Sequence, residues 1–213
     1  LHCGNSLVGA RRQVFNKSEL TYKKAKDPSW LNSEPAELAM NIPREEKQIF
    51  HFLLPDSGMA NYSDKTVKQR YPDDFKALDS WRKEFTKSFE AHEVADVQRI
   101  SGKVEALWNT FRQQLKAERQ KTADNYPVWP ADNTAQVRSS IRSKDETFSG
   151  RLEDNSTYQK LRWVMDYWSA LWFWPIDKAN ELPDRGMWLM EMETLLDGCL
   201  LYTSPSPRDR SVS

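Results

Sequence analysis

Residues 72–121 read PDDFKALDSWRKEFTKSFEAHEVADVQRISGKVEALWNTFRQQLKAERQK and carry the strongest structural pattern in the chain. Apolar residues recur at steps of 3, 3, 4 and 4, at Phe75, Leu78, Trp81, Phe85 and Phe89. This spacing places their side chains on one stripe of an α-helix. The helix is predicted to begin at Pro72, because proline is tolerated in a first turn.

A second apolar stripe follows after a short polar break near residues 91–93. Its steps are 3, 3, 4, 3, 4 and 4, over Val94, Val97, Ile100, Val104, Leu107, Phe111 and Leu115. Two long amphipathic helices with a short connection favour an antiparallel hairpin. The sequence therefore predicts a mainly α-helical protein built on a helix pair over residues 72–121.

Three further elements are expected to be helical. Residues 34–40 form a predicted helical turn capped by Ser33. A broad apolar stripe predicts a helix from Asn155 or Ser156 to about Phe173, stopped by Pro175. A last helix is predicted to start at Pro183, with Asp184 in its first turn, and to end at Gly198.

Composition narrows the classes of function. The 213 residues include 31 basic and 31 acidic side chains, so a globally basic nucleic-acid binder is not expected. The two Cys are far apart, which favours a reducing, cytoplasmic setting, and the first ten residues lack the pattern of a signal peptide. The most apolar stretch, residues 163–176, is interrupted by Asp166 and is too short to span a membrane, so no membrane partner is expected.

Catalytic and metal-binding motifs are absent from the sequence. Zinc sites need paired ligands at fixed spacing, and His2, Cys3, His51, His92 and Cys199 show none. Neither a G-x-S-x-G elbow nor a glycine-rich phosphate loop occurs. We therefore predict no catalytic residue and no metal ligand in this chain.

Two clusters have both a functional and a structural interpretation. The aromatic run Tyr167–Trp174 has the composition of a base-stacking platform, but on an apolar helix it is more often part of the core. Arg138, Arg142 and Lys144 are suited to phosphate contacts, but they lie among Ser, Asp and Glu, which favours a solvated surface.

The first nine residues, Leu1–Gly9, read LHCGNSLVG and predict a strand that ends in a glycine-bounded turn. An Asn at such a turn can point its amide into the crevice where open α/β sheets bind ligands. Its donor and acceptor can read an adenine edge. The simpler interpretation is that Asn5 only forms a turn.

The segment Cys3–Gly9, CGNSLVG, resembles the C-G-[N/D]-S-L-[I/V]-G segment of the large adenine-specific (N6) DNA methyltransferases. This group comprises the Eco57I-like, type IIG and phage-defence (BREX and DISARM) proteins. Further stretches resemble the long helical insertion that follows this segment in the family, namely IFHFLLP at 49–55 with Gly58 and Met59, WRKEF at 81–85, and ALWFWP at 170–175 followed by Leu182 and Pro183.

The resemblance implies two regions: residues 1–9 as the end of a cofactor-binding strand from an α/β methyltransferase sheet, and 10–198 as a mostly helical insertion. Residues 199–213 are a separate tail. The resemblance implies that Asn5, with Ser6 beside it, contacts the adenine of S-adenosylmethionine. It also implies DNA and defence-system subunits as partners of the full-length protein. The family's D-P-A-C-G-S-G and N-P-P-[YFW] motifs are absent, so the chain alone is expected to be an inactive internal fragment.

The tail Cys199–Ser213 has no helical period, and its segment 199–209 resembles the conceptual translation of a transposon-type sequencing adapter. We expect it not to belong to the natural protein, and the alternative is a disordered Ser/Pro tail. For the chain as a whole, the competing hypothesis is a self-standing helical interaction module that binds no cofactor.

Overall fold

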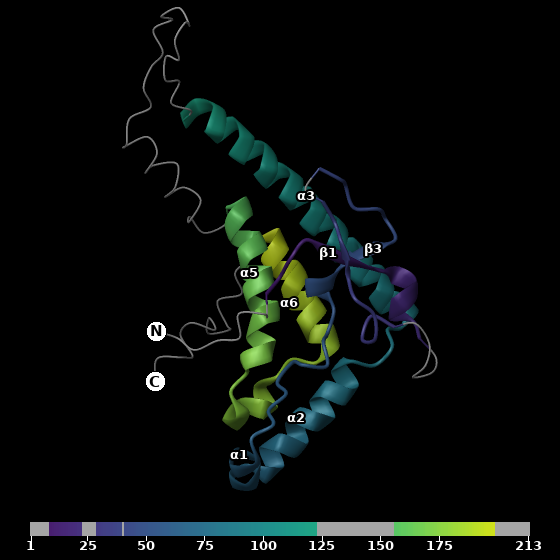
Figure 1. The fold of residues 1–213 in the computed structure, drawn as a ribbon, viewed down its shortest axis with the longest axis vertical. Coiled ribbons are helices and arrows are strands. Elements are labelled where there is room, and N and C mark those ends of the chain that lie inside the picture. The colour runs from purple at the N-terminus through teal and green to yellow at the C-terminus, as the bar shows by residue number, and fades with distance from the viewer. Residues whose placement is uncertain (1–8, 23–28, 40, 123–155, 199–213) are drawn as a thin grey trace, which may run out of the picture.

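The computed structural model describes residues 9–22, 29–39, 41–122 and 156–198, which form a mainly helical body around a small sheet (Figure 1). The α-helices are α1 (Lys65–Arg70), α2 (Pro72–Phe85), α3 (Ala91–Thr122), α5 (Thr157–Ala170) and α6 (Arg185–Asp197). Short 3₁₀ segments are η1 (Lys17–Leu20), η2 (His51–Leu53), η3 (Leu171–Phe173) and η4 (Ile176–Glu181). The predicted mainly α class is confirmed.

The sheet has three antiparallel strands in the order β2-β1-β3. The strands are β1 (Gln13–Asn16), β2 (Ala36–Glu37) and β3 (Gln48–Phe50). Val14 of the central strand lies opposite Ala36 on one side and Phe50 on the other. Apolar residues of β1 and β3 enter the core, so the sheet forms one wall of the apolar interior.

Side-chain caps fix where three of the α-helices begin. The carboxylates of Asp64 and Asp184 accept backbone N–H groups in the first turns of α1 and α6, and the Ser156 hydroxyl does the same for α5. Gly198 ends α6 with φ 80°, a left-handed conformation that glycine adopts without strain. The predicted starts of these last two helices are confirmed to within two residues, and so is the end of α6 at Gly198.

The core lies where α3 packs against α5, α6 and β3. Figure 1 shows α5 and α6 side by side under the middle of α3, whose later part extends beyond them. The largest fully buried side chains come from several different elements. They include Trp188 of α6, Phe50 of β3, Phe52 of η2, Phe85 of α2 and Ile100 of α3. One contiguous core thus joins the sheet, the long helix and the last two helices.

The predicted antiparallel hairpin is wrong in its pairing, although both of its helices exist. Helix α2 packs against η4, whereas α3 packs against α5 and α6. Figure 1 shows α2 and α3 running in different directions from their connection instead of lying along one another. Phe89, predicted on the first stripe, lies in that connection, where its N–H donates to the carbonyl of Leu20.

Contacts between residues far apart in the sequence determine which element packs against α2. The indole N–H of Trp81 donates to the Pro183 carbonyl at 2.7 Å, which ties α2 to the segment before α6. Arg185, at the start of α6, donates to the carbonyls of Lys87 and Ser88 in the connection and pairs with Glu93 of α3. These contacts hold α2 against the segment before α6 and away from α3.

The helical turn predicted over residues 34–40 is also wrong. Ala36 and Glu37 form β2, because the backbone around them pairs with β1. The Ser33 hydroxyl donates to Glu19 and to the Ser29 carbonyl and does not cap a helix. The predicted strand and turn at residues 1–9 lie outside the described residues except for Gly9.

Candidate functional site

The predicted cofactor-binding residues Asn5 and Ser6 lie outside the described residues. The described chain begins at Gly9, the last residue of the segment that resembles the methyltransferases. Ala10 packs against the core, and the next two residues, Arg11 and Arg12, make the first side-chain and backbone hydrogen bonds to the body. The candidate site is therefore the set of side chains that contact Arg11 and Arg12.

Arg12 forms a buried ion pair with Glu105 of α3. Its two terminal nitrogens lie 3.2 Å from the two carboxylate oxygens, and the side chains are only 7% and 12% exposed. The guanidinium also donates to the Ile42 carbonyl at 3.0 Å. Its carbon lies 5.8 Å from the Phe50 ring and 5.6 Å from the Trp108 ring. The paired, desolvated charges therefore join the start of β1 to the middle of α3.

A second arginine completes the cluster. The backbone N–H of Arg44 lies 3.5 Å from Glu105, and its guanidinium donates to the carbonyls of Glu45 and Gln48. Burial lowers the pKa of Arg44, while the negative charges of Glu105 and Glu46 act in the opposite direction. A guanidinium stays protonated under these conditions, so the cluster keeps its positive charge.

His51 binds the backbone of Arg11, the residue before Arg12. The Arg11 N–H donates to His51 Nε2 at 2.8 Å, so this nitrogen carries a lone pair and the ring is neutral. Burial lowers the pKa of His51 to about 4, and the positive charge of Arg11 acts in the same direction. The ring meets Trp168 edge to face at 5.3 Å. His51 is thus a neutral acceptor that fixes the backbone of Arg11.

A recess of about 130 Å³ lies beside His51. It is lined by Phe15, Trp30, Leu31, Ser33, Pro35, His51, Leu54, Pro55 and Asp56. The indole N–H of Trp30 is already bonded to the Pro55 carbonyl at 2.8 Å, and the Asp56 carboxylate accepts the Gly58 N–H at 2.7 Å. Two of its polar groups are thus already bonded within the protein, and its volume is small compared with typical ligand pockets.

The arrangement around Arg12 anchors the chain and does not suit acid–base chemistry. Both oxygens of Glu105 are held by Arg12, and one also accepts from Asn109 at 3.4 Å. A general base has to reach a substrate proton, and Glu105 is 9% exposed with both oxygens bonded to Arg12, so it is poorly placed for that role. Among the described residues no group of three or more His, Cys, Asp or Glu side chains is placed to hold a metal ion.

The aromatic run Tyr167–Trp174 belongs mainly to the core, as the structural interpretation predicted. Trp168 and Trp174 are 5% and 8% exposed, and their indole N–H groups donate to the carbonyls of Leu54 and Lys178. Phe173 is the exception at 53% exposure. Arg138, Arg142 and Lys144 lie outside the described residues. No helix in the described part of the chain is long and apolar enough to cross a membrane.

Little in the sequence points to the Arg12–Glu105 pair. The two residues are 93 positions apart, and neither belongs to a recognisable motif. The weak signal is the position of Glu105 directly after Val104, which lies on the apolar stripe of α3. A carboxylate so close to a buried stripe needs a cationic partner.

Comparisons with family models, with curated proteins and with solved structures gave no match for this chain. Its function is therefore inferred from the residues themselves and from their geometry.

Proposed function

We propose that this chain is an internal part of an S-adenosylmethionine-dependent DNA adenine-N6 methyltransferase of a restriction-modification or phage-defence system. The observation that carries the proposal is the segment Cys3–Gly9, with Asn5 at the position that the family uses for the adenine of the cofactor. The helical body that follows supports the proposal, because a helical region is expected after this segment.

In this role the chain supplies positioning and not the chemical step. The methyl group passes from the sulfonium of S-adenosylmethionine to N6 of an adenine that is turned out of the duplex. Asn5 reads the adenine edge of the cofactor through its amide, with Ser6 beside it. The groups that hold the target amino group belong to the N-P-P-[YFW] loop, which this chain lacks, so the chain alone does not methylate DNA.

The anchor at Arg11 and Arg12 suits this role. It holds the chain two to three residues after Gly9, where the resemblance ends. A binding loop is more precise when the segments beside it are fixed by packing and hydrogen bonds. The buried pair with Glu105 and the bond to His51 provide such support.

The experiment that tests the proposal begins with long-read sequencing across both ends of the reading frame. We expect a D-P-x-x-G-x-G motif upstream and an N-P-P-[YFW] motif downstream. The extended protein is then assayed for transfer of labelled methyl groups from S-adenosylmethionine to DNA. Asn5→Ala is expected to raise the KM for the cofactor, whereas Asn61→Ala, on an exposed loop, leaves it unchanged. An extended reading frame that contains neither motif would refute the proposal.

The competing function is a helical interaction module, and the exposed methionines of α6 favour it. Met187 and Met190 are 48% and 57% exposed and lie one turn apart on the same helix. Exposed methionines are common on adaptable protein-binding surfaces. A frame that contains neither motif, together with loss of a partner protein on Met187→Ser and Met190→Ser, would support this alternative.

A further inference from the structure

One face of α3 contacts the sheet in the middle of the helix and carries basic side chains nearer the C-terminal end of the helix. In the middle of α3 this face packs against the sheet: the Ser101 hydroxyl accepts the Phe50 N–H at 3.3 Å, and Glu105 pairs with Arg12. Arg112, Lys116 and Arg119 continue the face, at successive steps of 7, 4 and 3 from Glu105. With 3.6 residues per turn, these positions lie close to one line along the helix.

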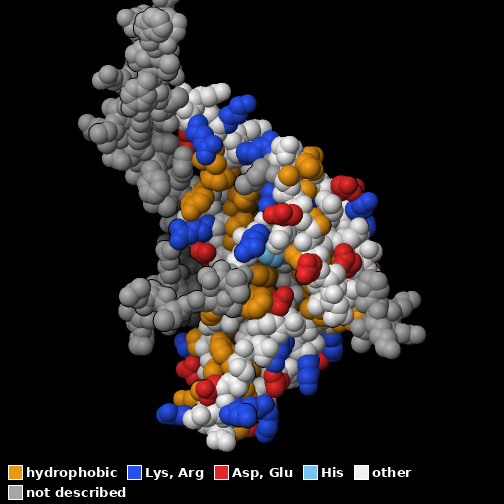
Figure 2. All heavy atoms as spheres, viewed as in Figure 1, with side chains coloured by type: hydrophobic (Ala, Val, Ile, Leu, Met, Phe, Trp, Pro, Cys, Tyr) orange, Lys and Arg blue, Asp and Glu red, His pale blue; other side chains and the backbone are white. Residues whose placement is uncertain are grey.

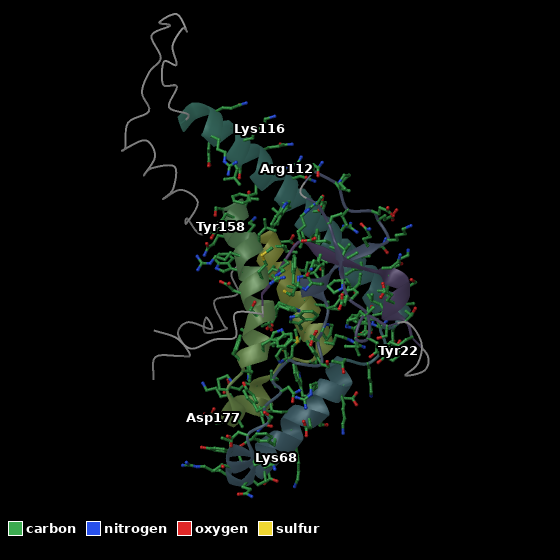
Figure 3. The ribbon with its side chains drawn as sticks, viewed as in Figure 1. Tyr22, Lys68, Arg112, Lys116, Tyr158 and Asp177 are labelled. Carbon is green, nitrogen blue, oxygen red and sulfur yellow. The ribbon has the colours of Figure 1, made fainter. Side chains whose placement is uncertain are left out.

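The basic part of this line lies where α3 extends beyond the body. Arg112, Lys116 and Arg119 are exposed, and within the described residues neither Lys116 nor Arg119 forms an ion pair. Figure 2 shows Lys and Arg side chains gathered over this end of the helix. Figure 3 shows Arg112 and Lys116 on it, near Tyr158 at the start of α5. Tyr158 packs against Phe111 at 5.6 Å, which fixes this part of α3.

We propose that Arg112, Lys116 and Arg119 form a phosphate-binding stripe that contacts the backbone of duplex DNA. Glu118 is the one acidic residue between positions 106 and 120, so the local charge is positive although the whole chain is neutral. Successive charges are about 6 Å and about 4.5 Å apart along the helix axis. Each strand of duplex DNA presents a phosphate about every 3.4 Å of the duplex axis, so charges at this spacing can each meet a phosphate of one strand.

Arginine strengthens this assignment, because its planar guanidinium binds phosphate through two parallel hydrogen bonds. The helix holds the three residues in line, so only their side chains have to be ordered on binding. The choice of DNA over other polyanions rests on the proposed function. The stripe starts about 10 Å along the axis from Glu105, where the segment after Gly9 is anchored. The DNA backbone would therefore approach α3 from the side of the sheet.

The test measures binding of the complete 213-residue chain to a short fluorescein-labelled DNA duplex of mixed sequence. Anisotropy titrations are run between about 50 and 200 mM salt, where phosphate contacts dominate the salt dependence. The test variant is Arg112→Gln/Lys116→Gln/Arg119→Gln. The matched control is Lys65→Gln/Arg70→Gln/Lys83→Gln, which removes the same charge from exposed positions on α1 and α2.

We expect the test variant to bind at least about tenfold more weakly and its log K against log salt slope to become shallower by nearly 3, since each phosphate contact contributes about 0.9. The control should bind like the wild type. A second variant, Arg112→Lys/Arg119→Lys, keeps the charges and should retain the salt slope. Circular dichroism melts of all variants show whether they are folded.

Three outcomes overturn the stripe. Equal weakening in the test and control variants would mean that only net charge matters. Absence of salt-dependent binding by the wild type would mean that this surface does not contact DNA. Equally tight, stripe-dependent binding of polyglutamate would identify an acidic protein as the partner instead. None of these measurements involves the cofactor or methyl transfer, so failure of the stripe is distinguishable from failure of the proposed methyltransferase function.

Discussion

Gly58 shows how closely single residues pack in this body. A β-carbon at Gly58 would clash with the ring of Trp172, which is partly buried and packs against Trp168. We expect Gly58→Ala to lower the free energy of unfolding by about 1–3 kcal/mol, because the ring has to move. The measurement is urea unfolding followed by circular dichroism.

Gly102 provides the matched control for that substitution. It lies inside α3, and the nearest atom to an added β-carbon is a terminal nitrogen of Arg44 at 3.7 Å, an ordinary contact. Gly102→Ala should stabilise the protein by up to about 1 kcal/mol through helix propensity. Equal stability of Gly58→Ala and the wild type would show that the Trp172 ring relaxes without cost.

His51 makes the stability of the protein depend on pH in a defined window. Its pKa is lowered from 6.5 to about 4 in the folded state, so the unfolded chain binds the proton more tightly. The contribution is fully present above pH 6.5 and is lost as the pH falls toward 4. We expect a loss of about 2 kcal/mol between about pH 7.5 and about pH 5 from this group.

The comparison that isolates His51 is the variant His51→Gln, which keeps an acceptor for the Arg11 N–H but does not titrate in this range. Both proteins are unfolded in urea at the two pH values. The wild type should lose about 2 kcal/mol more than the variant over this interval. The same pH dependence in both proteins would assign the effect to other groups.

At the scale of elements, the sequence predicts what depends on local spacing. The apolar period locates α2, α3, α5 and α6, and the caps Ser156 and Asp184 place the starts of α5 and α6, because these signals lie within or beside each segment. The sheet was missed because its strands have only 2–4 residues, too few for a period to show. The partner of α2 was predicted wrongly because it depends on contacts of Trp81 and Arg185 with residues about 100 positions away.

In the candidate site, too, the sequence predicts the features that lie within one contiguous segment and not the contacts between distant residues. The resemblance at residues 3–9 can be found from sequence alone because it is a contiguous motif. The anchor beside it joins Arg11 to His51 across 40 positions and Arg12 to Glu105 across 93 positions. Apart from the weak signal of Glu105 beside the apolar stripe, a single sequence does not show such contacts, since they form only when the sheet packs against α3.

The Arg12–Glu105 pair yields a prediction about how these elements are joined. Arg12→Met or Glu105→Leu alone leaves one buried charge without its partner and should cost about 3–5 kcal/mol. The double variant removes both charges and should recover a large part of that loss. The measurement is a double-mutant cycle in urea. Additive losses would show that the two side chains do not interact in solution.

At the scale of the whole molecule, one core accounts for the stability of the described chain. Its buried side chains run from Val14 to Leu196 and include members of the sheet, α3, α5 and α6. Charged contacts on the surface add to this packing, as where Lys103 bonds Asp197 at 2.7 Å. Exposed pairs of this kind contribute little, so burial of the core side chains is the main source of stability.

Deleting residues 199–213 tests how much of the chain this core needs. Helix α6 ends at Asp197, and the Gly198 N–H donates to the Leu195 carbonyl, so the cap is complete at residue 198. Among the described residues, the last buried side chain of the core is Leu196. We therefore expect the chain 1–198 to keep the melting temperature and the urea m-value of the full chain, because m follows the surface exposed on unfolding. Leu196→Ala, at a residue 3% exposed, is the positive control and should cost about 2–5 kcal/mol. A clear fall in the melting temperature of chain 1–198 would mean that the tail is part of the fold, and its resemblance to an adapter translation would then be coincidental.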